Sequence, residues 1–503
     1  MRQGYILALD QGTTSSRALL FDRAGRVLGQ AQRRVSLRHP RPGWVEADGE
    51  DLVESQRQAA LACLNEAGVS PAAVCALGIA NQRETTLLWE RGSGRLVAPA
   101  IIWQCRRSTA IAQRWRGLGL ESRVRKLTGL TLDPYFSATK LAWLLETGPD
   151  LRRMAEAGDL AFGTVDTFLV YRLTAGKSHL TDVSNASRTA FFDLETLAWD
   201  DELLAAMGIP RALLPRVVDS SGALAVSDTA WFGQELAVAS MIGDQQAALF
   251  GQQCHAPGLA KCTLGTGAFV LGYGGERPGP VAEGLIRTVA WRRQGEAAIY
   301  AWEGSTFTAG ALLEWLSHEL GLLARPQDAD QMATSVADTA DLVVVPAFSG
   351  LGSPYWDASA RGLWIGLTAA TTRQHVVRAA LEAIAFQVAD VVRSMAAGAG
   401  HAFNELRIDG GVGQSNFLAQ FLADILALPV VRPRMPEATA RGAAFLAGLA
   451  RGLWRDLDQL PSPEAGERFV PRMRFDEAER RYLRWRTAVA RARGWAPNGE
   501  EEC

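Results

Sequence analysis

The amino-terminal stretch "ILALDQGTTSSRALLFD" (residues 6–22) is apolar, then small and polar, then apolar again. This pattern predicts a strand, a tight turn and a second strand, with a third strand after "DRAGRVLGQ" in an antiparallel meander. Apolar residues at helical spacing near residues 51–67 predict a helix that ends at Gly68. The next strand, in "VCALGIANQRETTLLWE", ends in the polar cluster "NQRE", at the carboxyl end where α/β sheets bind ligands.

The unit "AKCTLGTGAFVLGYGG" (residues 260–275) has the same strand, glycine-threonine turn and strand pattern. The repetition predicts a duplicated α/β fold around a central cleft, with domains of residues 1–251 and 252–503. Residues 371–398 predict a long helix that begins at a threonine and ends at Gly398, and "ATARGAAFLAGLA" predicts a closely packed helix. The arginine-rich tail beyond about Glu464 is expected to be a solvated helical face.

The first turn has the chemistry of a phosphate-binding loop. Small and hydroxylated residues expose backbone N–H groups, Asp10 precedes them and Arg17 follows. An aspartate beside a phosphate would repel it unless a cation stood between, so we expect Mg²⁺ held near Asp10, through water. An ordinary polar hairpin is the alternative, but the second turn at 264–267 favours a pair of phosphate hairpins. The chain contains no GxxxxGK[ST] motif, which excludes that nucleotide-binding loop.

The composition indicates which classes of molecule the protein can bind. The chain has 503 residues, and 52 Lys and Arg balance 54 Asp and Glu, so no charge excess points to nucleic acid or a membrane surface. We find no signal peptide and no stretch able to cross a bilayer, and expect a cytoplasmic protein. The six cysteines have no CxxC spacing and the six histidines no zinc pattern, so the thiols are expected to be reduced and structural.

Eight motifs in order along residues 5 to about 450 resemble the FGGY carbohydrate kinases, and among them the members that phosphorylate glycerol. They are "LDQGTTSSR", "NQRET", "LDPYFSATK", "VDTFLVYRLTAG", "VSNASRTAFFD", "IGDQQAALFGQ", "LGTGAF" and "GLGSPYWD". The resemblance implies two ribonuclease-H-like domains of the actin/hexokinase type and transfer of the ATP γ-phosphoryl group to a polyol hydroxyl, here giving sn-glycerol 3-phosphate in glycerol catabolism. It also implies a homo-oligomer, a dimer or tetramer.

The resemblance also implies the roles of individual residues. Asp244 would be the general base, and the polyol contacts would be Arg83, Glu84, Tyr135, Asp244 and Gln245, with Trp103 and Phe269 as aromatic walls. The nucleotide contacts would be Thr13, Thr14, Ser15, Arg17, Thr266, Gly310, Glu314, Gly411 and Ser415. A polyol site needs carboxylates that accept from hydroxyls and a guanidinium that donates to them, which this set provides.

The chain departs from the family pattern at several positions. Glu314 and Ser415 stand where Gln and Asn are common in these kinases, and Ala138 stands where glycine is usual. The glycine-rich loop for fructose 1,6-bisphosphate is missing, and the regulatory histidine would fall near Ala230, so neither control is expected.

Other interpretations remain open at this stage. The substrate could be xylulose, gluconate or erythritol, and the same cleft could belong to an actin-like or chaperone-like ATPase. From residues alone, Tyr135 could pack a loop and Arg83–Glu84 could be a surface ion pair. Gly410 and Gly411 more often mark backbone geometry than ligand contact.

Overall fold

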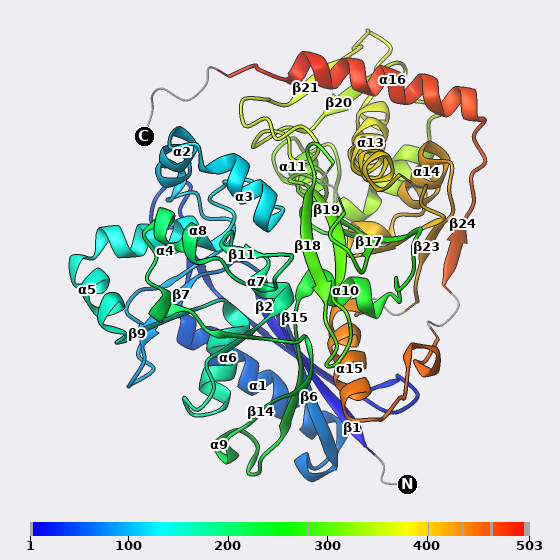
Figure 1. Cartoon of the computed structure of the whole chain (residues 1–503). Coiled ribbons are helices and arrows are strands. Elements are labelled where there is room, and N and C mark those ends of the chain that lie inside the picture. The colour runs from blue at the N-terminus through cyan, green and yellow to red at the C-terminus, as the bar shows by residue number, and fades with distance from the viewer. Residues whose placement is uncertain (1–3, 280–281, 401, 435–436, 463–465, 497–503) are drawn as a thin grey trace.

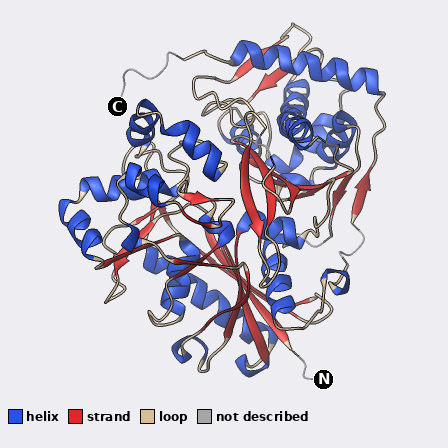
Figure 2. Ribbon diagram, in the orientation of Figure 1, coloured by secondary structure: helices blue, strands red, loops and turns tan. Residues whose placement is uncertain are grey.

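The structure, a computed structural model, describes residues 4–279, 282–400, 402–434, 437–462 and 466–496. Within these residues the chain forms two large β-sheets with helices packed against their faces (Figures 1 and 2). The predicted α/β class with two duplicated sheets is confirmed.

The first sheet has the strand order β14-β15-β6-β1-β2-β3. Its strands are β1 Tyr5–Gln11, β2 Ser15–Phe21, β3 Val27–Arg34, β6 Val74–Asn81, β14 Ser221–Val226 and β15 Ala237–Gly243. The predicted meander is present, because β1, β2 and β3 pair antiparallel. The central strands β1, β6 and β15 run parallel, so their carboxyl ends meet at one edge.

The second sheet repeats this plan in the order β18-β19-β17-β16-β22-β23-β24. Its strands are β16 Leu259–Leu264, β17 Ala268–Gly275, β18 Ile286–Trp291, β19 Ile299–Thr306, β22 Glu405–Asp409, β23 Val430–Arg432 and β24 Glu467–Phe469. The hairpin of β16 and β17 corresponds to that of β1 and β2, and β22 lies parallel to β16 as β6 does to β1. The two glycine-threonine turns therefore occupy equivalent positions in the two sheets.

Helices and short strands cover both sheets. The helices of residues 49–251 are α1 Gly49–Ala67, α2 Thr109–Gly117, α3 Leu120–Thr128, α4 Ser137–Thr147, α5 Pro149–Ala157, α6 Val165–Leu173, α7 Val183–Ala186, α8 Asp201–Met207, α9 Thr229–Phe232 and α10 Asp244–Gly251. The later helices are α11 Gly310–His318, α12 Ala329–Thr334, α13 Arg373–Ala399, α14 Asn416–Leu426, α15 Ala438–Ala450 and α16 Phe475–Ala492. Short strands pair in small sheets: β4 Leu37–Arg38, β5 Glu46–Ala47, β7 Leu87–Glu90, β8 Ala100–Ile101, β9 Leu160–Gly163, β10 Leu180–Asp182, β11 Phe192–Asp193, β12 Ala198–Trp199, β13 Arg216–Val218, β20 Val343–Val345 and β21 Leu363–Ile365.

Helix α15 crosses between the two halves of the chain. It packs against α10 and against β1, β6 and β15 of the first sheet, although it follows the second sheet in sequence (Figure 1). The helices approach closely through glycine: a Cβ at Gly442 would lie 1.9 Å from the carbonyl oxygen of Ala247, and one at Gly251 would lie 2.0 Å from that of Ala438. The close packing predicted for "ATARGAAFLAGLA" is confirmed. The division at residue 251 stays a prediction.

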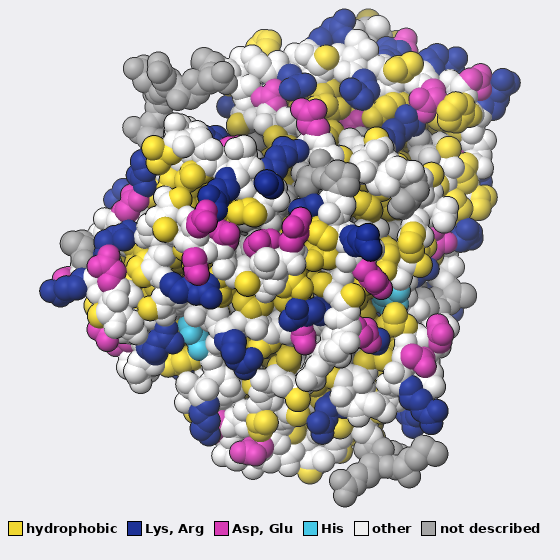
Figure 3. Space-filling model, in the orientation of Figure 1, with side chains coloured by type: hydrophobic (Ala, Val, Ile, Leu, Met, Phe, Trp, Pro, Cys, Tyr) yellow, Lys and Arg dark blue, Asp and Glu magenta, His cyan; other side chains and the backbone are white. Residues whose placement is uncertain are grey.

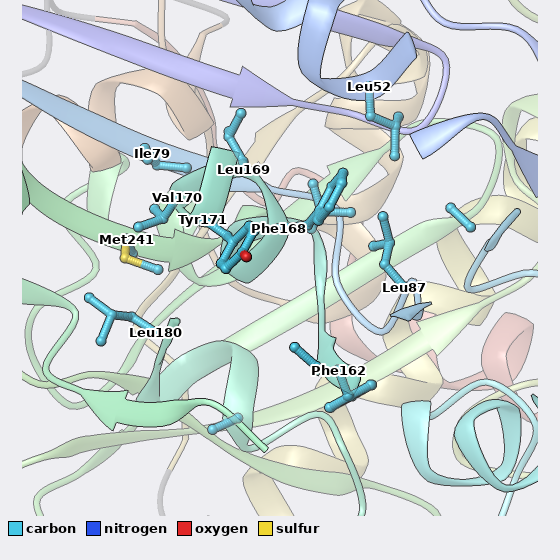
Figure 4. Packing of buried hydrophobic residues seen from close by; sticks show 14 of the residues in the cluster. Leu52, Ile79, Leu87, Phe162, Phe168, Leu169, Val170, Tyr171, Leu180 and Met241 are labelled. Atoms are coloured by element: carbon cyan, nitrogen blue, oxygen red, sulfur yellow. The ribbon is translucent and has the colours of Figure 1, made fainter. Parts of the chain in front are cut away.

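Each sheet has its own apolar core. Leu52, Ile79, Leu87 and Phe168 belong to the core of the first half, where side chains from α1, β6, β7 and α6 meet (Figure 4). Helix α1 ends as predicted, because Gly68 has a left-handed backbone that lets its N–H reach the carbonyl of Asn65.

Two expectations about the later helices are wrong in detail. Helix α13 ends at Ala399 with Gly400, not Gly398, in the left-handed capping position. The tail is not only a solvated face, because α16 buries Tyr482, Trp485 and Val489 in the second core. Arginines occupy its other side, as in an ordinary amphipathic helix. Residues 463–465, at the expected start of this tail, lie outside the described part.

The remaining expectations concern surface, membrane and thiols. Basic and acidic side chains are interspersed on the face seen in Figure 3. Among the described residues, no helix has the length and apolarity needed to cross a membrane. Cys63, Cys75, Cys105, Cys254 and Cys262 are free thiols, as expected, and Cys503 lies outside the described residues.

Candidate active site

The polar cluster after β6 forms the floor of the site. Strand β6 ends at Asn81, and Glu84 has a left-handed backbone with φ of 59°. The chain has therefore left the strand, where neighbouring side chains would point to opposite faces. Arg83 and Glu84 are both buried, and Arg83 Nε lies 3.8 Å from Glu84 Oε1. A surface ion pair is excluded for these two residues.

Three aromatic rings stand beside this floor. Trp103 contacts Tyr135 edge-to-face at 5.6 Å between ring centroids, and Phe269 at 6.2 Å. The Tyr135 hydroxyl accepts a 3.4 Å hydrogen bond from Arg83 Nη2. The three rings are partly exposed, as walls of a small pocket would be.

Asp244 begins α10 directly after β15, so the parallel strands bring it to the same edge as Arg83. Arg83 Nε lies 3.4 Å from Asp244 Oδ1, and the N–H of Gln245 donates to that oxygen at 2.7 Å. Burial raises the pKa of the Asp244 carboxyl, although Arg83 and Lys261 act in the opposite direction. A partly exposed carboxylate, a guanidinium and aromatic rings thus form one connected cluster.

Sequence reasoning assigned no role to four charged or amide residues that support this pocket. Glu303, on β19, accepts from both terminal nitrogens of Arg83 at 2.6 and 2.9 Å. Arg188 donates to Glu84 at 2.6 Å, and Gln246 accepts from Arg83 at 3.2 Å. Lys261, on β16, donates to Gln245 and, at 3.0 Å, to Thr263. Arg188 and Gln246 lie in quoted motifs, whereas nothing local marked Glu303.

The first hairpin lies against the same pocket. Trp103 Nε1 donates a 3.0 Å hydrogen bond to the hydroxyl of Thr13, while Thr14 is exposed at the tip and Ser15 is buried. Asp10 and Arg17 are cross-strand partners on β1 and β2. Arg17 also forms a 3.1 Å ion pair with Glu437.

Asp10 carries an incompletely neutralised charge. Burial raises the pKa of its carboxyl to about 7, and the charges of Asp244 and Glu437 contribute in the same direction against that of Arg17. Among the described residues, no three His, Cys, Asp or Glu side chains gather as a metal cluster. A single carboxylate is nevertheless sufficient for Mg²⁺. In proteins this ion usually keeps several waters, and its other ligands are one or two carboxylates and the phosphates of the substrate.

The second hairpin borders a cavity of about 630 Å³. Its walls include five of the residues predicted to bind nucleotide: Thr266, Gly310, Glu314, Gly411 and Ser415. Gly310 is needed for this packing, because a Cβ there would lie 2.7 Å from the carbonyl oxygen of Gly265. Gly411 has open space around it, whereas Gly410 has φ of 87° and no room for a side chain beside Leu264.

Two side chains of this cavity have partners within the protein. The Ser415 hydroxyl bonds to Asp330 and accepts from the N–H of Leu418 at 2.9 Å, so it caps α14. Glu314 lies 3.3 Å from His318 on the same helix. Asp330, which the sequence did not indicate, accepts from the N–H groups of Asn416 and Phe417 at 2.7 and 3.1 Å.

Most of the chain matches the two domains of one protein family. Residues 5–251 match the N-terminal domain of the FGGY family of carbohydrate kinases, and residues 260–451 match its C-terminal domain. This chain belongs to the FGGY family of carbohydrate kinases. Each matched range contains one of the two equivalent hairpins.

Individual FGGY relatives resemble the chain over nearly its whole length. It is 52% identical to the glycerol kinase of Aromatoleum aromaticum over 98% of this chain and 99% of that one. It is 50% identical to the glycerol kinase of Bordetella parapertussis over 98% of each. A crystal structure of Plasmodium falciparum glycerol kinase with ADP superposes with a TM-score of 0.91 at 31% identity, covering 97% of this chain and 98% of that one.

Proposed function

We propose that this protein transfers the γ-phosphoryl group of ATP to glycerol and releases ADP and sn-glycerol 3-phosphate. The observation that carries the proposal is the meeting of Arg83 and Asp244 beside three aromatic rings, of which Tyr135 is one. The relatives named glycerol kinases support the choice of the smallest polyol.

In this proposal Asp244 is the general base. Its partly exposed carboxylate accepts the proton of the attacking hydroxyl, and the new O–P bond forms as the bond to the ADP oxygen breaks. Arg83 donates to a substrate hydroxyl while Glu84 and Gln245 accept from others. Because the transition state of phosphoryl transfer is loose, positioning and charge neutralisation supply most of the rate enhancement.

The two hairpins would hold the triphosphate. Backbone N–H groups and the hydroxyls of Thr13, Thr14, Ser15 and Thr266 are the proposed donors, and the cavity beside Gly411 takes the adenosine. Asp10 would hold Mg²⁺ through water, and the ion would neutralise the β- and γ-phosphate oxygens. Arg17 is proposed to act mainly through Asp10, its cross-strand partner.

A substrate panel tests the proposal. Purified protein with Mg·ATP is assayed for ADP release with glycerol, dihydroxyacetone, erythritol and xylulose, and the product is analysed for phosphate position. We expect the highest kcat/KM for glycerol and one ADP for each glycerol 3-phosphate. A clearly better four- or five-carbon substrate would contradict the specificity, and ADP release without any phosphorylated polyol would indicate an ATPase.

Two further properties follow from the family rather than from this site. We expect the reaction in the cytoplasm and a dimer or tetramer in solution. Light scattering of the purified protein measures the second property directly.

A further inference from the structure

Glu303 belongs to the second sheet but contacts the polyol pocket of the first. It lies on β19 with no exposed surface, and its two carboxylate oxygens accept from Arg83 Nη1 and Nη2 at 2.6 and 2.9 Å. This is the bidentate geometry in which a carboxylate holds a guanidinium in one orientation. The two residues are 220 positions apart in the chain.

Arg188 extends the contact to Glu84. Its Nη2 donates to Glu303 at 3.1 Å and its Nε donates to Glu84 at 2.6 Å. Two arginines and two glutamates thus form a buried cluster with balanced formal charge. Burial alone would raise the pKa of Glu303, but the charges of Arg188 and Arg83 outweigh it and lower that pKa, which favours the ionised carboxylate.

The hydrogen bonds of Arg83 show what this cluster controls. Nη1 is committed to Glu303 and to Gln246 at 3.2 Å. Nη2 donates to Glu303 at 2.9 Å and also reaches the Tyr135 hydroxyl at 3.4 Å, while Nε lies 3.4 Å from Asp244. A guanidinium released from Glu303 would be free to turn and to approach the Asp244 carboxylate more closely than the present 3.4 Å, which would make that carboxylate a poorer proton acceptor.

We propose that Glu303 is a positioning residue of the polyol site: it orients Arg83 directly and Glu84 through Arg188. The role rests on the proposed function, because it concerns the hydroxyl contacts of the acceptor. It also means that a residue from the nucleotide-binding half completes the acceptor pocket.

The test compares two substitutions at this position. Glu303→Gln keeps the size and removes the charge, whereas Glu303→Asp keeps the charge and is one methylene too short to hold both nitrogens of Arg83. We expect both to raise the KM for glycerol on the order of 10- to 100-fold, as is typical when a supporting contact of a site is lost. The KM for Mg·ATP should change less than about twofold, because the nucleotide contacts are separate.

Glu382→Gln provides the matched control. Glu382 is also a buried glutamate of the second half, and it pairs with Arg378 at 3.0 Å and Arg481 at 3.6 Å, with no contact to the site. It should lower the thermal midpoint without changing the KM for glycerol. A purely structural Glu303 would give this same result, so an unchanged glycerol KM in folded Glu303→Gln overturns the proposal.

The remaining outcomes are also decisive. If Glu303→Asp matches the wild type while Glu303→Gln does not, charge alone is required and positioning is overturned. If Glu303→Gln does not fold, the glycerol KM of Glu303→Asp is the test of the proposal. Absence of glycerol turnover in the wild-type protein contradicts the proposed function instead, and the variants are then measured with whichever polyol the panel identifies.

Discussion

The indole of Trp103 joins the proposed polyol pocket to the turn of the first hairpin, because its Nε1 donates a 3.0 Å hydrogen bond to the hydroxyl of Thr13. The same ring packs edge-to-face against Tyr135 and Phe269. One side chain therefore contacts both the proposed acceptor walls and the proposed phosphate donors. Removing its hydrogen bond should disturb the alignment of the two substrates.

We expect Trp103→Phe to lower kcat/KM by at least roughly 2- to 10-fold, the value of one neutral hydrogen bond, because the N–H is lost while a smaller aromatic wall remains. Thr13→Val should give a similar loss and Thr13→Ser almost none. The double variant Trp103→Phe/Thr13→Val should be no worse than either single variant, because both remove one interaction. Additive losses in steady-state assays would show that the two side chains act independently.

Asp244→Asn should lower kcat by about 10²- to 10⁴-fold, the usual contribution of a general base, while the protein stays folded. The thermal midpoint and glycerol binding by calorimetry are the controls. Because burial raises the pKa of this carboxyl, wild-type activity should fall on the acid side at a higher pH than for an ordinary aspartate. Full activity of Asp244→Asn would show that Asp244 is not the general base.

Asp166 should make the protein less stable as the pH rises. It is fully buried, and burial together with the charge of Asp182 raises its pKa to about 7, despite hydrogen bonds from Thr164 and Thr181. The folded state then holds a proton that the unfolded chain releases near pH 4, so this contribution to stability is complete below pH 4 and is lost as the pH rises through about 7.

Asp166→Asn should remove this contribution to the pH dependence of the free energy of unfolding. The contribution has a slope of at most about 1.4 kcal/mol per pH unit between the unfolded and folded pKa values. Urea unfolding at several pH values measures it, with the exposed Asp458→Asn as control. An equal pH dependence in wild type and Asp166→Asn would mean that this carboxyl is ionised in the folded protein.

Gly442→Ala should destabilise the protein by roughly 3 kcal/mol or more, because the new methyl would lie 1.9 Å from a backbone oxygen of α10 that cannot move independently. Since α10 begins at Asp244, kcat should fall as well. Gly92→Ala, where the added Cβ meets nothing within 4 Å, is the matched control and should change neither property. Equal thermal midpoints for the two variants would show that α15 and α10 can separate without penalty.

Features that depend on neighbouring residues could be predicted from the sequence. Small and hydroxylated residues between two apolar runs indicated the hairpins, and Gly68 supplied the left-handed end of α1. The polar residues after β6 were placed at a carboxyl edge, where Arg83 and Glu84 indeed lie. These predictions succeeded because backbone geometry and side-chain periodicity are local.

Tertiary structure alone decided which distant segments meet. No local pattern pairs Glu303 with Arg83, directs α15 back onto the first sheet, or engages the Ser415 hydroxyl with Asp330. Periodicity predicts that a position is buried, but it does not predict which residues pack against it. The sequence around a buried charge is the same whether its partner is four residues away or 220. The sequence by itself thus determined the hairpins and the chemistry available at their ends, while long-range packing determined which charges hold that chemistry in place.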